Sequence, residues 1–273
     1  MGAPRSCAIG SGLGLRSMLL ALAVLGTGFG PAASRAQAQA VVADLPIPSG
    51  GTERIAFLPA PAPRATVILL AGGQGIVQIG ADGGTGNSNF LIRSRNLWAA
   101  YGVNALVLGS PDNNSLLGQR SQPGYATALA LAVDFARSRS DVPVWLVGTS
   151  QGSIAAVNGA ARLGGRVAGI VLTSSVTQQS RSGETVFGAG PSAVAVPALV
   201  VANSRDGCSA SPPSDAPRLL AAMAGSPRKE MILFDSSAIQ SDPCQALSPH
   251  GYLGIESSVV ARIAAWIGAA PGG

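Results

Sequence analysis

A short segment that reads strand, tight turn and helix constrains this chain more than any other feature. Residues 142–147 (VPVWLV) are apolar throughout, which is typical of a strand buried in a parallel sheet. They lead into Gly148-Thr149-Ser150-Gln151-Gly152, and the small residues of 153–161 predict a helix packed closely on that sheet. Strand, Gly-x-Ser-x-Gly and helix in this order form a sharp turn that exposes the serine hydroxyl. Because the chain has 36 glycines, the motif can also arise by chance, and its surroundings must decide.

Short apolar segments alternate with helical segments along the rest of the chain. The expected strands are 54–58, 65–70, 103–108, 142–147, 167–173, 196–202 and 230–235. The expected helices are 90–101, 125–138, 153–161, 216–224 and 255–267. This alternation predicts an α/β fold with a mostly parallel central sheet and helices on both faces. Functional groups of such folds lie beyond the carboxyl ends of the strands.

Residues 1–40 have the pattern of a secretory signal peptide. Two arginines precede an apolar core at 18–25, which is about half the length of a membrane-spanning helix. Small-residue cleavage sites follow between residues 36 and 40. We therefore expect an exported protein, periplasmic or secreted. It would keep a single domain at 41–273 and no stable membrane anchor after cleavage.

The basic character of the chain comes largely from this N-terminal segment. The whole chain has 18 basic and 13 acidic residues. Three arginines and no acidic residue precede residue 40, so the exported chain keeps 15 basic against 13 acidic residues. Nucleic-acid binding needs clustered Lys and Arg, and the sequence contains no such cluster. We therefore expect no nucleic-acid partner.

Export also changes the interpretation of the cysteines. Cys7 lies in the signal segment, which leaves Cys208 and Cys244 in the mature chain. In an oxidising compartment two cysteines most simply form one disulfide, although two separate buried thiols are the alternative. The sequence has one histidine and no Cys-x-x-Cys spacing, so we expect no metal site. We also expect no cofactor, because there is no Walker loop and the glycine-rich segment 80–86 does not follow a strand.

Three residues that can carry nucleophilic chemistry follow three different expected strands. Ser150 follows the strand at 142–147, and Asp206 follows the strand at 196–202. His250, the single histidine, lies after the last strand and before the last helix. A serine hydroxyl needs a base to take its proton, and the imidazole needs an acid to fix its tautomer. The chain order Ser, Asp, His is the order that this architecture requires for such a set.

Each of these assignments has a purely structural alternative. The serine could be a small residue in a tight turn, the histidine could cap the last helix, and Asp206 could be an ordinary turn residue. Asp235 and Asp242 are rival acids, but Asp235 ends a different strand and Asp242 lies in a Ser-Asp-Pro-Cys run. Glu256 is expected to favour the N-terminus of the last helix by its charge rather than to join the set.

Over residues 54–267 the chain resembles the α/β-hydrolases. Its His-Gly-Tyr-Leu-Gly-Ile-Glu segment is similar to the histidine loop of the dienelactone-hydrolase-like branch, which commonly has a cysteine where this chain has Ser150. The resemblance implies an α/β-hydrolase fold with Ser150 as nucleophile, His250 as general base and acid, and Asp206 as the orienting acid. A Cys208–Cys244 disulfide would then tie the acid loop to the histidine loop, and we expect it to support catalysis as well as stability.

The resemblance also implies an oxyanion hole made of two backbone amides. One is the amide of the residue after the serine, here Gln151. The other comes from the loop after the strand at 65–70, which reads Ala-Gly-Gly-Gln where His-Gly is frequent. Gly73 is the first choice for this second amide, and Gln74 is its rival. One such donor stabilises the transition state by about 3–4 kcal/mol.

The connection from residue 176 to 194 is about 19 residues long, too short for a large lid domain, so we expect an open site. Polar loops at 78–89 and 110–115 are the candidate walls, which favours small or polar esters. We therefore expect a carboxylic ester hydrolase acting on a small-molecule ester or acyl substrate. Acyl transfer or peptide cleavage by the same residues, and a non-catalytic binding protein, are the alternatives. The sequence does not indicate an oligomeric state.

Overall fold

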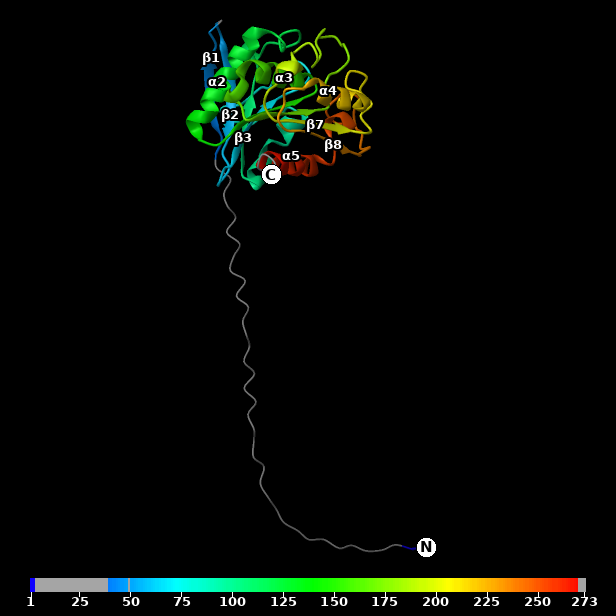
Figure 1. Cartoon of the computed structure of the whole chain (residues 1–273). Helices are drawn as coiled ribbons and strands as arrows, with labels where there is room; N and C mark the ends of the chain where they lie inside the picture. Colours follow the sequence, from blue (N-terminus) through cyan, green and yellow to red (C-terminus); the bar gives the residue numbers. More distant parts are fainter. Residues whose placement is uncertain (3–38, 49, 270–273) are drawn as a thin grey trace. The chain divides into compact units, whose positions relative to one another are not determined.

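Among the described residues, eight strands pair into a sheet in the order β1-β2-β4-β3-β5-β6-β7-β8 (Figure 1). The structure is a computed structural model that describes residues 1–2, 39–48 and 50–269. β1 and β4 run antiparallel to β2, and the other neighbouring pairs are parallel, so the predicted mostly parallel sheet is confirmed. The strands are β1 (Val41–Pro46), β2 (Thr52–Leu58), β3 (Ala65–Leu70), β4 (Val103–Leu108), β5 (Val144–Thr149), β6 (Gly169–Thr173), β7 (Ala198–Asn203) and β8 (Lys229–Phe234).

Strand β1 is not among the strands expected from the sequence. Its segment, VVADLP, contains an aspartate, ends in proline and is only partly buried. It lies at the edge of the sheet and pairs on one side only, with Val41 opposite Phe57 of β2. Pairing with β2 supplies the hydrogen bonds of this strand, and proline is tolerated at such an edge. A local hydrophobic pattern therefore does not signal it.

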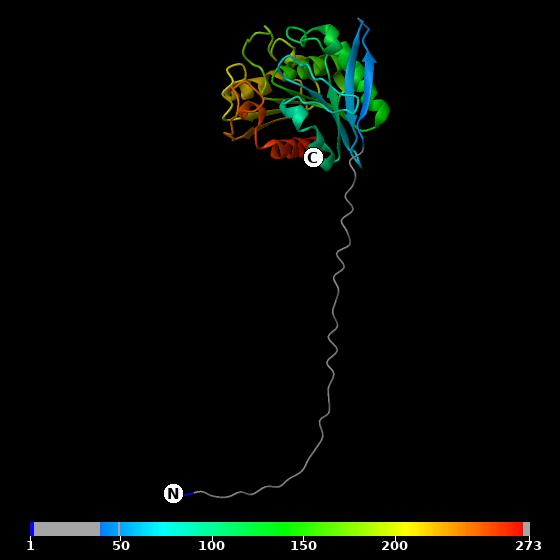
Figure 2. The same ribbon diagram turned by 180° about the vertical axis from the view of Figure 1, so that it is seen from behind.

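Helices cover both faces of the sheet, as predicted. Helices α2, α3 and α4 belong to one apolar cluster, and α1, the 3-10 helix η1 and α5 belong to a second. Figures 1 and 2 show α2 and α3 on one side of the strands and α5 on the other. The helices are α1 (Phe90–Arg93), η1 (Arg95–Tyr101), α2 (Pro123–Arg139), α3 (Gln151–Leu163), α4 (Ala216–Ala222) and α5 (Glu256–Gly268).

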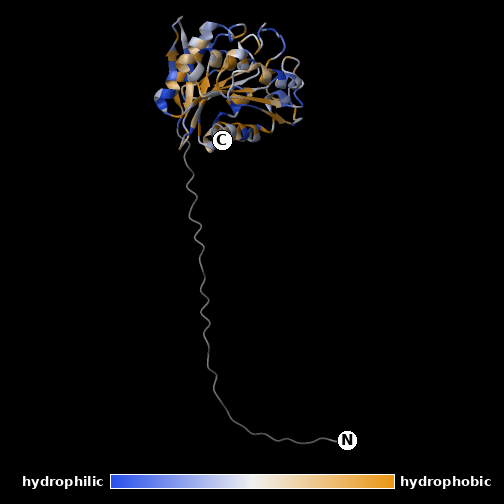
Figure 3. Cartoon of the chain, in the orientation of Figure 1, coloured by the Kyte–Doolittle hydropathy of each residue, from blue (hydrophilic) through white to orange (hydrophobic). Residues whose placement is uncertain are grey.

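The central strands are continuously apolar because both of their faces are covered. In β3, Ile68 and Leu70 pack in the first cluster, whereas Val67 and Leu69 pack in the second. All six residues of β3 are buried, and the same holds for β5. Figure 3 shows these strands as hydrophobic segments inside more polar surroundings. Side chains alternate between the faces of a strand, so only continuous apolar sequence satisfies both layers.

The single helix expected over residues 90–101 is wrong. α1 ends at Arg93, and the tighter 3-10 helix η1 follows after Ser94. The Ser94 hydroxyl donates to the carbonyl of Leu91 at 3.4 Å, and such local side-chain bonds compete with a continuous α-helix. Trp98, within η1, is fully buried in the second cluster.

The connection between β6 and β7 contains no lid helix. Its regular structure is one three-residue 3-10 helix, η4 (Pro191–Ala193), and buried Val176, Val186 and Val194 pack it into the first cluster. None of the described helices combines the length and apolar character needed to cross a bilayer. The signal peptide expected at 1–40 lies almost wholly outside the described residues.

Candidate active site

Ser150 lies in the sharp turn between β5 and α3. Its backbone has φ 53° and ψ −123°, a conformation that non-glycine residues rarely adopt. Both glycines of the motif are required by space: a Cβ on Gly148 would lie 2.2 Å from the carbonyl oxygen of Gly152, and a Cβ on Gly152 would lie 2.0 Å from that of Leu70. The Ser150 amide donates to the carbonyl of Thr173 at 2.9 Å, which fixes the turn to β6. The predicted strand–turn–helix geometry is therefore present.

His250 lies in the short 3-10 helix η6 (Pro249–Gly251), after β8 and before α5. It is 4% exposed. The hydroxyl of Ser174 donates to its carbonyl at 2.8 Å, and the amide of Asn203 donates to the carbonyl of Pro249 at 2.9 Å. Gly251 permits a close approach, because a Cβ there would lie 1.9 Å from the Ala246 carbonyl oxygen. The ends of β6 and β7 thus fix the histidine loop.

Tyr252 anchors the same loop from the core. Its hydroxyl donates to the carbonyl of Val201 at 2.9 Å and accepts from the amide of Ser174 at 3.2 Å. Burial raises the pKa of this phenol well above its usual range, so it remains a neutral donor. Its ring packs on Phe90 with centroids 4.9 Å apart.

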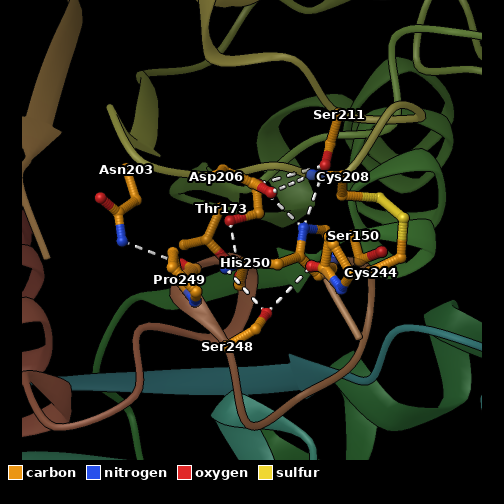
Figure 4. A network of polar contacts seen from close by, with 12 residues as sticks. Ser150, Thr173, Asn203, Asp206, Cys208, Ser211, Cys244, Ser248, Pro249 and His250 are labelled. Carbon is orange, nitrogen blue, oxygen red and sulfur yellow. Dashed lines mark hydrogen bonds and ion pairs between the residues drawn. A yellow bond between two sulfur atoms is a disulfide. The ribbon is translucent and has the colours of Figure 1, made fainter. Parts of the chain in front are cut away.

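Asp206 and His250 form a buried pair (Figure 4). Oδ2 of Asp206 lies 2.9 Å from Nδ1 of His250, and the side chains are only 1% and 5% exposed. The other carboxylate oxygen accepts from the amide of Cys208 at 2.9 Å. A carboxylate at Nδ1 favours the tautomer with the proton on that nitrogen, which leaves Nε2 free to accept a proton.

Ser211 is a third member of this network and was not expected from the sequence. Its hydroxyl donates to Oδ2 of Asp206 at 3.2 Å and lies 3.0 Å from Nδ1 of His250. No motif marks it, because its place is set by the turn after Asp206, in which its amide donates to the carbonyl of Cys208. The hydroxyl adds a polar partner to a buried carboxylate.

The rival acids lie elsewhere. Asp235 is exposed and binds Ser204 and Arg205, and these hydrogen bonds lower the pKa of its carboxyl. Asp242 is exposed. Glu256 is the first residue of α5 and pairs with Arg93 at 2.8 Å, as expected of a charge at a helix N-terminus. Of these four described acidic residues, only Asp206 contacts the imidazole.

A disulfide joins Cys208 and Cys244. Cys208 lies in the loop of Asp206, and Cys244 lies in the loop that leads to His250. Their Cα atoms are 4.5 Å apart although 36 positions separate them in sequence. The bond therefore connects the acid loop to the histidine loop covalently, beside the carboxylate–imidazole pair (Figure 4).

Ser150 and His250 line one cleft of about 290 Å³. Its other lining residues are Gly72, Gly73, Gln74, Gly75, Ile76, Asn87, Ser88, Asn89, Phe90, Thr149, Cys244, Gln245, Ala246 and Gly251. The expectation that 78–89 and 110–115 form its walls is mostly wrong. Only residues 87–89 line the cleft, whereas residues 78–80 and Ser110 line a separate polar cavity of about 740 Å³. The glycine-rich loop at 72–75 takes their place in the wall.

The loop after β3 lies directly against the serine. A Cβ on Gly72 would lie 2.9 Å from Cβ of Ser150, so only glycine fits there. Gly73 has φ +58°, and the Gly75 amide donates to the carbonyl of Gly72 at 3.1 Å, which makes a tight turn. On the other side, Gln151 is the first residue of α3, where backbone N–H groups have no partner within the helix. Backbone amides thus flank the serine from two elements.

No group of three or more His, Cys, Asp or Glu side chains that could bind a metal ion is found in the part of the chain that the structure describes. The polar side chains that line the cleft are hydroxyls, an imidazole and amides. The arrangement is suited to proton transfer and nucleophilic attack by an oxygen atom.

Solved structures of other proteins identify the fold of this chain. No protein-family model matches the sequence, and no curated protein matches it significantly. Solved structures do match: an α/β serine hydrolase without lid from Xanthomonas campestris has 15% identity, covers 85% of this chain and 97% of its own, and has a TM-score of 0.56. An esterase from Pyrococcus furiosus (11% identity, 86% and 93%, TM-score 0.62) and a dienelactone hydrolase from Anabaena variabilis (14%, 85% and 97%, TM-score 0.59) are also similar. The chain has the α/β-hydrolase fold, in a form without a large lid domain.

Proposed function

We propose that this chain is a serine hydrolase that cleaves carboxylic esters through an acyl-enzyme on Ser150. One observation carries the proposal: the imidazole of the buried Asp206–His250 pair opens on the same cleft as a serine held in a strained turn. The strain has no benefit for folding and costs about 1–3 kcal/mol, which is typical of a functional position. Two of the similar structures are an esterase and a serine hydrolase by name, which is consistent with this chemistry.

In the proposed reaction, Ser150 Oγ attacks the ester carbonyl carbon while Nε2 of His250 takes the hydroxyl proton. Asp206 stabilises the imidazolium that forms and keeps its orientation. The tetrahedral intermediate then expels the alcohol, which receives the proton from Nε2. Water attacks the acyl-enzyme with the same imidazole as base, and the acid leaves as the serine hydroxyl is restored.

The negative oxygen of the intermediate would be bound by two backbone amides. Gln151 supplies one from the N-terminus of α3, where the helix dipole also favours negative charge. Gly73 supplies the other, with Gln74 as the alternative. Gly73 and Gln74 both line the cleft beside Ser150. Each donor is worth about 3–4 kcal/mol in the transition state.

The substrate class follows from the size and chemistry of the cleft. A volume of about 290 Å³ lies at the low end for ligand pockets, which commonly run from about 300 to 1,000 Å³. Its walls present the amide side chains of Gln74, Asn87 and Gln245 together with the apolar Ile76 and Phe90. A small ester with a short or polar acyl group fits this lining better than a long-chain lipid.

Export to the periplasm or the medium is part of the same proposal. The signal peptide at 1–40 would be removed, and a single hydrolase domain would remain at 41–273. The Cys208–Cys244 disulfide supports an oxidising compartment, because such bonds rarely persist in the cytosol. We expect the partner of the mature protein to be a small-molecule ester, with no nucleic acid.

A chain-length series of p-nitrophenyl esters tests the proposal, with matched anilides as amide analogues. We expect kcat/KM to be highest for acetate or butyrate, to fall steeply by octanoate, and to be near background for the anilides. Ser150→Ala should abolish turnover while leaving the unfolding temperature near that of the wild type. Turnover that persists in Ser150→Ala, or a clear preference for the anilides, would contradict the proposal.

A further inference from the structure

A buried arginine lies behind the loop that flanks Ser150. Arg120 precedes α2 and is 1% exposed. Its Nη2 donates to the carbonyl of Ala71 at 3.2 Å, at the start of the loop that contains Gly73. The other end of that loop also packs on the guanidinium: a Cβ on Gly75 would lie 2.6 Å from Nη2. One planar group therefore supports both ends of the loop.

The guanidinium is not explained by stability alone. Burial lowers the pKa of Arg120, and Tyr125 and then Glu184 act in the opposite direction. Nη1 is buried and finds no hydrogen-bond partner among the described residues. A buried charge with an incomplete set of partners is unfavourable for folding, and apolar replacements are often neutral or stabilising. A role in the adjacent site accounts for the presence of arginine at this position.

Glu184, from the β6–β7 connection, holds the segment that carries Arg120. One carboxylate oxygen accepts from the amide of Gly118 at 2.9 Å, and the other accepts from the amide and the hydroxyl of Ser121, each at 2.7 Å. Asn158 of α3 donates to the Arg120 carbonyl at 2.9 Å. The arginine backbone is thus fixed on both sides.

The same connection reaches Gln151, whose backbone amide is the other proposed oxyanion donor. The side-chain amide of Gln151 donates to the hydroxyls of Ser180 and Ser182, each at 3.0 Å. The amide of Glu184 in turn donates to the Ser182 hydroxyl at 3.2 Å. Residues 180–184 therefore contact Gln151 directly and the Gly73 loop through Arg120.

We propose that Arg120 is a positioning residue that, with Glu184, holds the Ala71–Gly75 loop in register with Gln151, so that the two oxyanion amides keep a fixed separation. This inference rests on the proposed function for its catalytic consequence. Its structural part, the restraint of the loop by Arg120, stands independently. The β6–β7 connection, which is too short to form a lid, restrains the segments that carry both oxyanion amides.

Loss of the restraint by Arg120 and Glu184 should weaken binding of the transition state more than binding of the substrate. Complete removal of an oxyanion donor costs about 10²–10³ in kcat, so a loosened donor is expected to cost about 10- to 100-fold. KM should change less than about threefold, because the ground-state carbonyl makes weaker use of the amides. Arg120→Lys keeps a cationic donor and should recover part of kcat, although it lacks the planar contact to Gly75.

The test combines ester kinetics with hydrogen exchange on the full mature chain. Wild type, Arg120→Met, Arg120→Lys and Glu184→Gln are compared with Arg137→Met, which removes an exposed arginine that also donates to a backbone carbonyl. Peptides covering residues 71–77 should exchange faster in Arg120→Met and, to a smaller extent, in Glu184→Gln, with wild-type rates in the control. Glu184→Gln preserves side-chain volume. Its exchange rates at 71–77 therefore still test the inference if Arg120→Met does not fold.

The outcomes are separable. Unchanged exchange at 71–77 in folded Arg120→Met and Glu184→Gln would overturn the inference, whatever the enzyme hydrolyses. A rise in KM with kcat unchanged, or a loss of thermal stability with kcat unchanged well below the unfolding temperature, would also overturn it. If wild type hydrolyses no ester but the loop exchanges faster in the variants, the proposed function fails and the positioning role remains.

Discussion

Glu53 gives a quantitative prediction because it is a buried carboxyl group without a partner. It lies on β2, is 0% exposed, and neither of its oxygens has a hydrogen-bond partner among the described residues. Burial raises the pKa of this carboxyl from 4.5 to about 8. The negative charge of ionised Glu53 also affects the pKa of a neighbouring phenol, Tyr125 of α2. Burial first, and then the charge of Glu53, raise the pKa of that phenol well above its usual range, so it stays neutral.

The sign and size of the effect on stability follow from linkage. The folded protein binds the Glu53 proton more tightly than the unfolded chain does. The contribution of this group to the free energy of unfolding is therefore fully present below pH 4.5 and is lost as the pH rises towards 8. At about 1.4 kcal/mol per pH unit, the loss is about 3 kcal/mol at pH 7 and about 5 kcal/mol above pH 8. These are large fractions of a typical free energy of unfolding, about 5–15 kcal/mol.

Glu53→Gln removes the ionisation and keeps a polar group of the same size. Urea unfolding is measured at pH 5, 6, 7 and 8 by tryptophan fluorescence with the disulfide intact. The free energy of unfolding of the variant should increase relative to that of wild type by about 1 kcal/mol per pH unit. The control is Glu230→Gln, at an exposed position on β8, whose free energy of unfolding should run parallel to wild type. Parallel curves for Glu53→Gln and wild type would refute the assignment of a buried, unpaired carboxyl.

Three further outcomes are expected. Asp206→Asn should lower kcat on a short p-nitrophenyl ester by about 10³- to 10⁴-fold with little change in KM, because the amide favours the wrong tautomer of His250; a loss below tenfold would contradict the pairing. Ser211→Ala should lower kcat by roughly 3- to 10-fold in steady-state kinetics, as one hydrogen bond to Asp206 is lost; a larger loss than in Asp206→Asn would be inconsistent. Replacing Cys208 and Cys244 by serine should remove about 4 kcal/mol of stability in urea unfolding, from the 36-residue separation, and also lower kcat. Two free thiols in the intact mass of exported wild type would contradict the disulfide.

Much of the fold could be predicted because the central strands are buried on both faces. β3 and β5 have no polar side that could hide the pattern, so the sequence alone places them within about two residues. The turn at Ser150 could be predicted because Gly148 and Gly152 mark close backbone approaches. By contrast, β1 depends on pairing at a sheet edge, and the break at Ser94 depends on one local hydrogen bond, and neither leaves a periodic signal.

The supporting residues of the site could not be predicted for a different reason. Ser211, Arg120 and Glu184 come from three loops that meet only when the sheet is assembled. The sequence contains many serines and arginines with the same local surroundings, and no spacing separates these from the rest. Asp206 could be favoured over Asp235 from strand order, but its contact with His250 required the geometry of the loop.

The central claim is that Ser150 is the nucleophile, and site mapping with a fluorophosphonate tests it most directly. The folded mature protein is labelled, digested, and its peptides are sequenced by mass spectrometry. We predict one adduct, on the serine at position 150, with no label in Ser150→Ala and strongly slowed labelling in Asp206→Asn. A folded wild-type protein that remains unlabelled, or an adduct on another residue that persists in Ser150→Ala, would contradict the account.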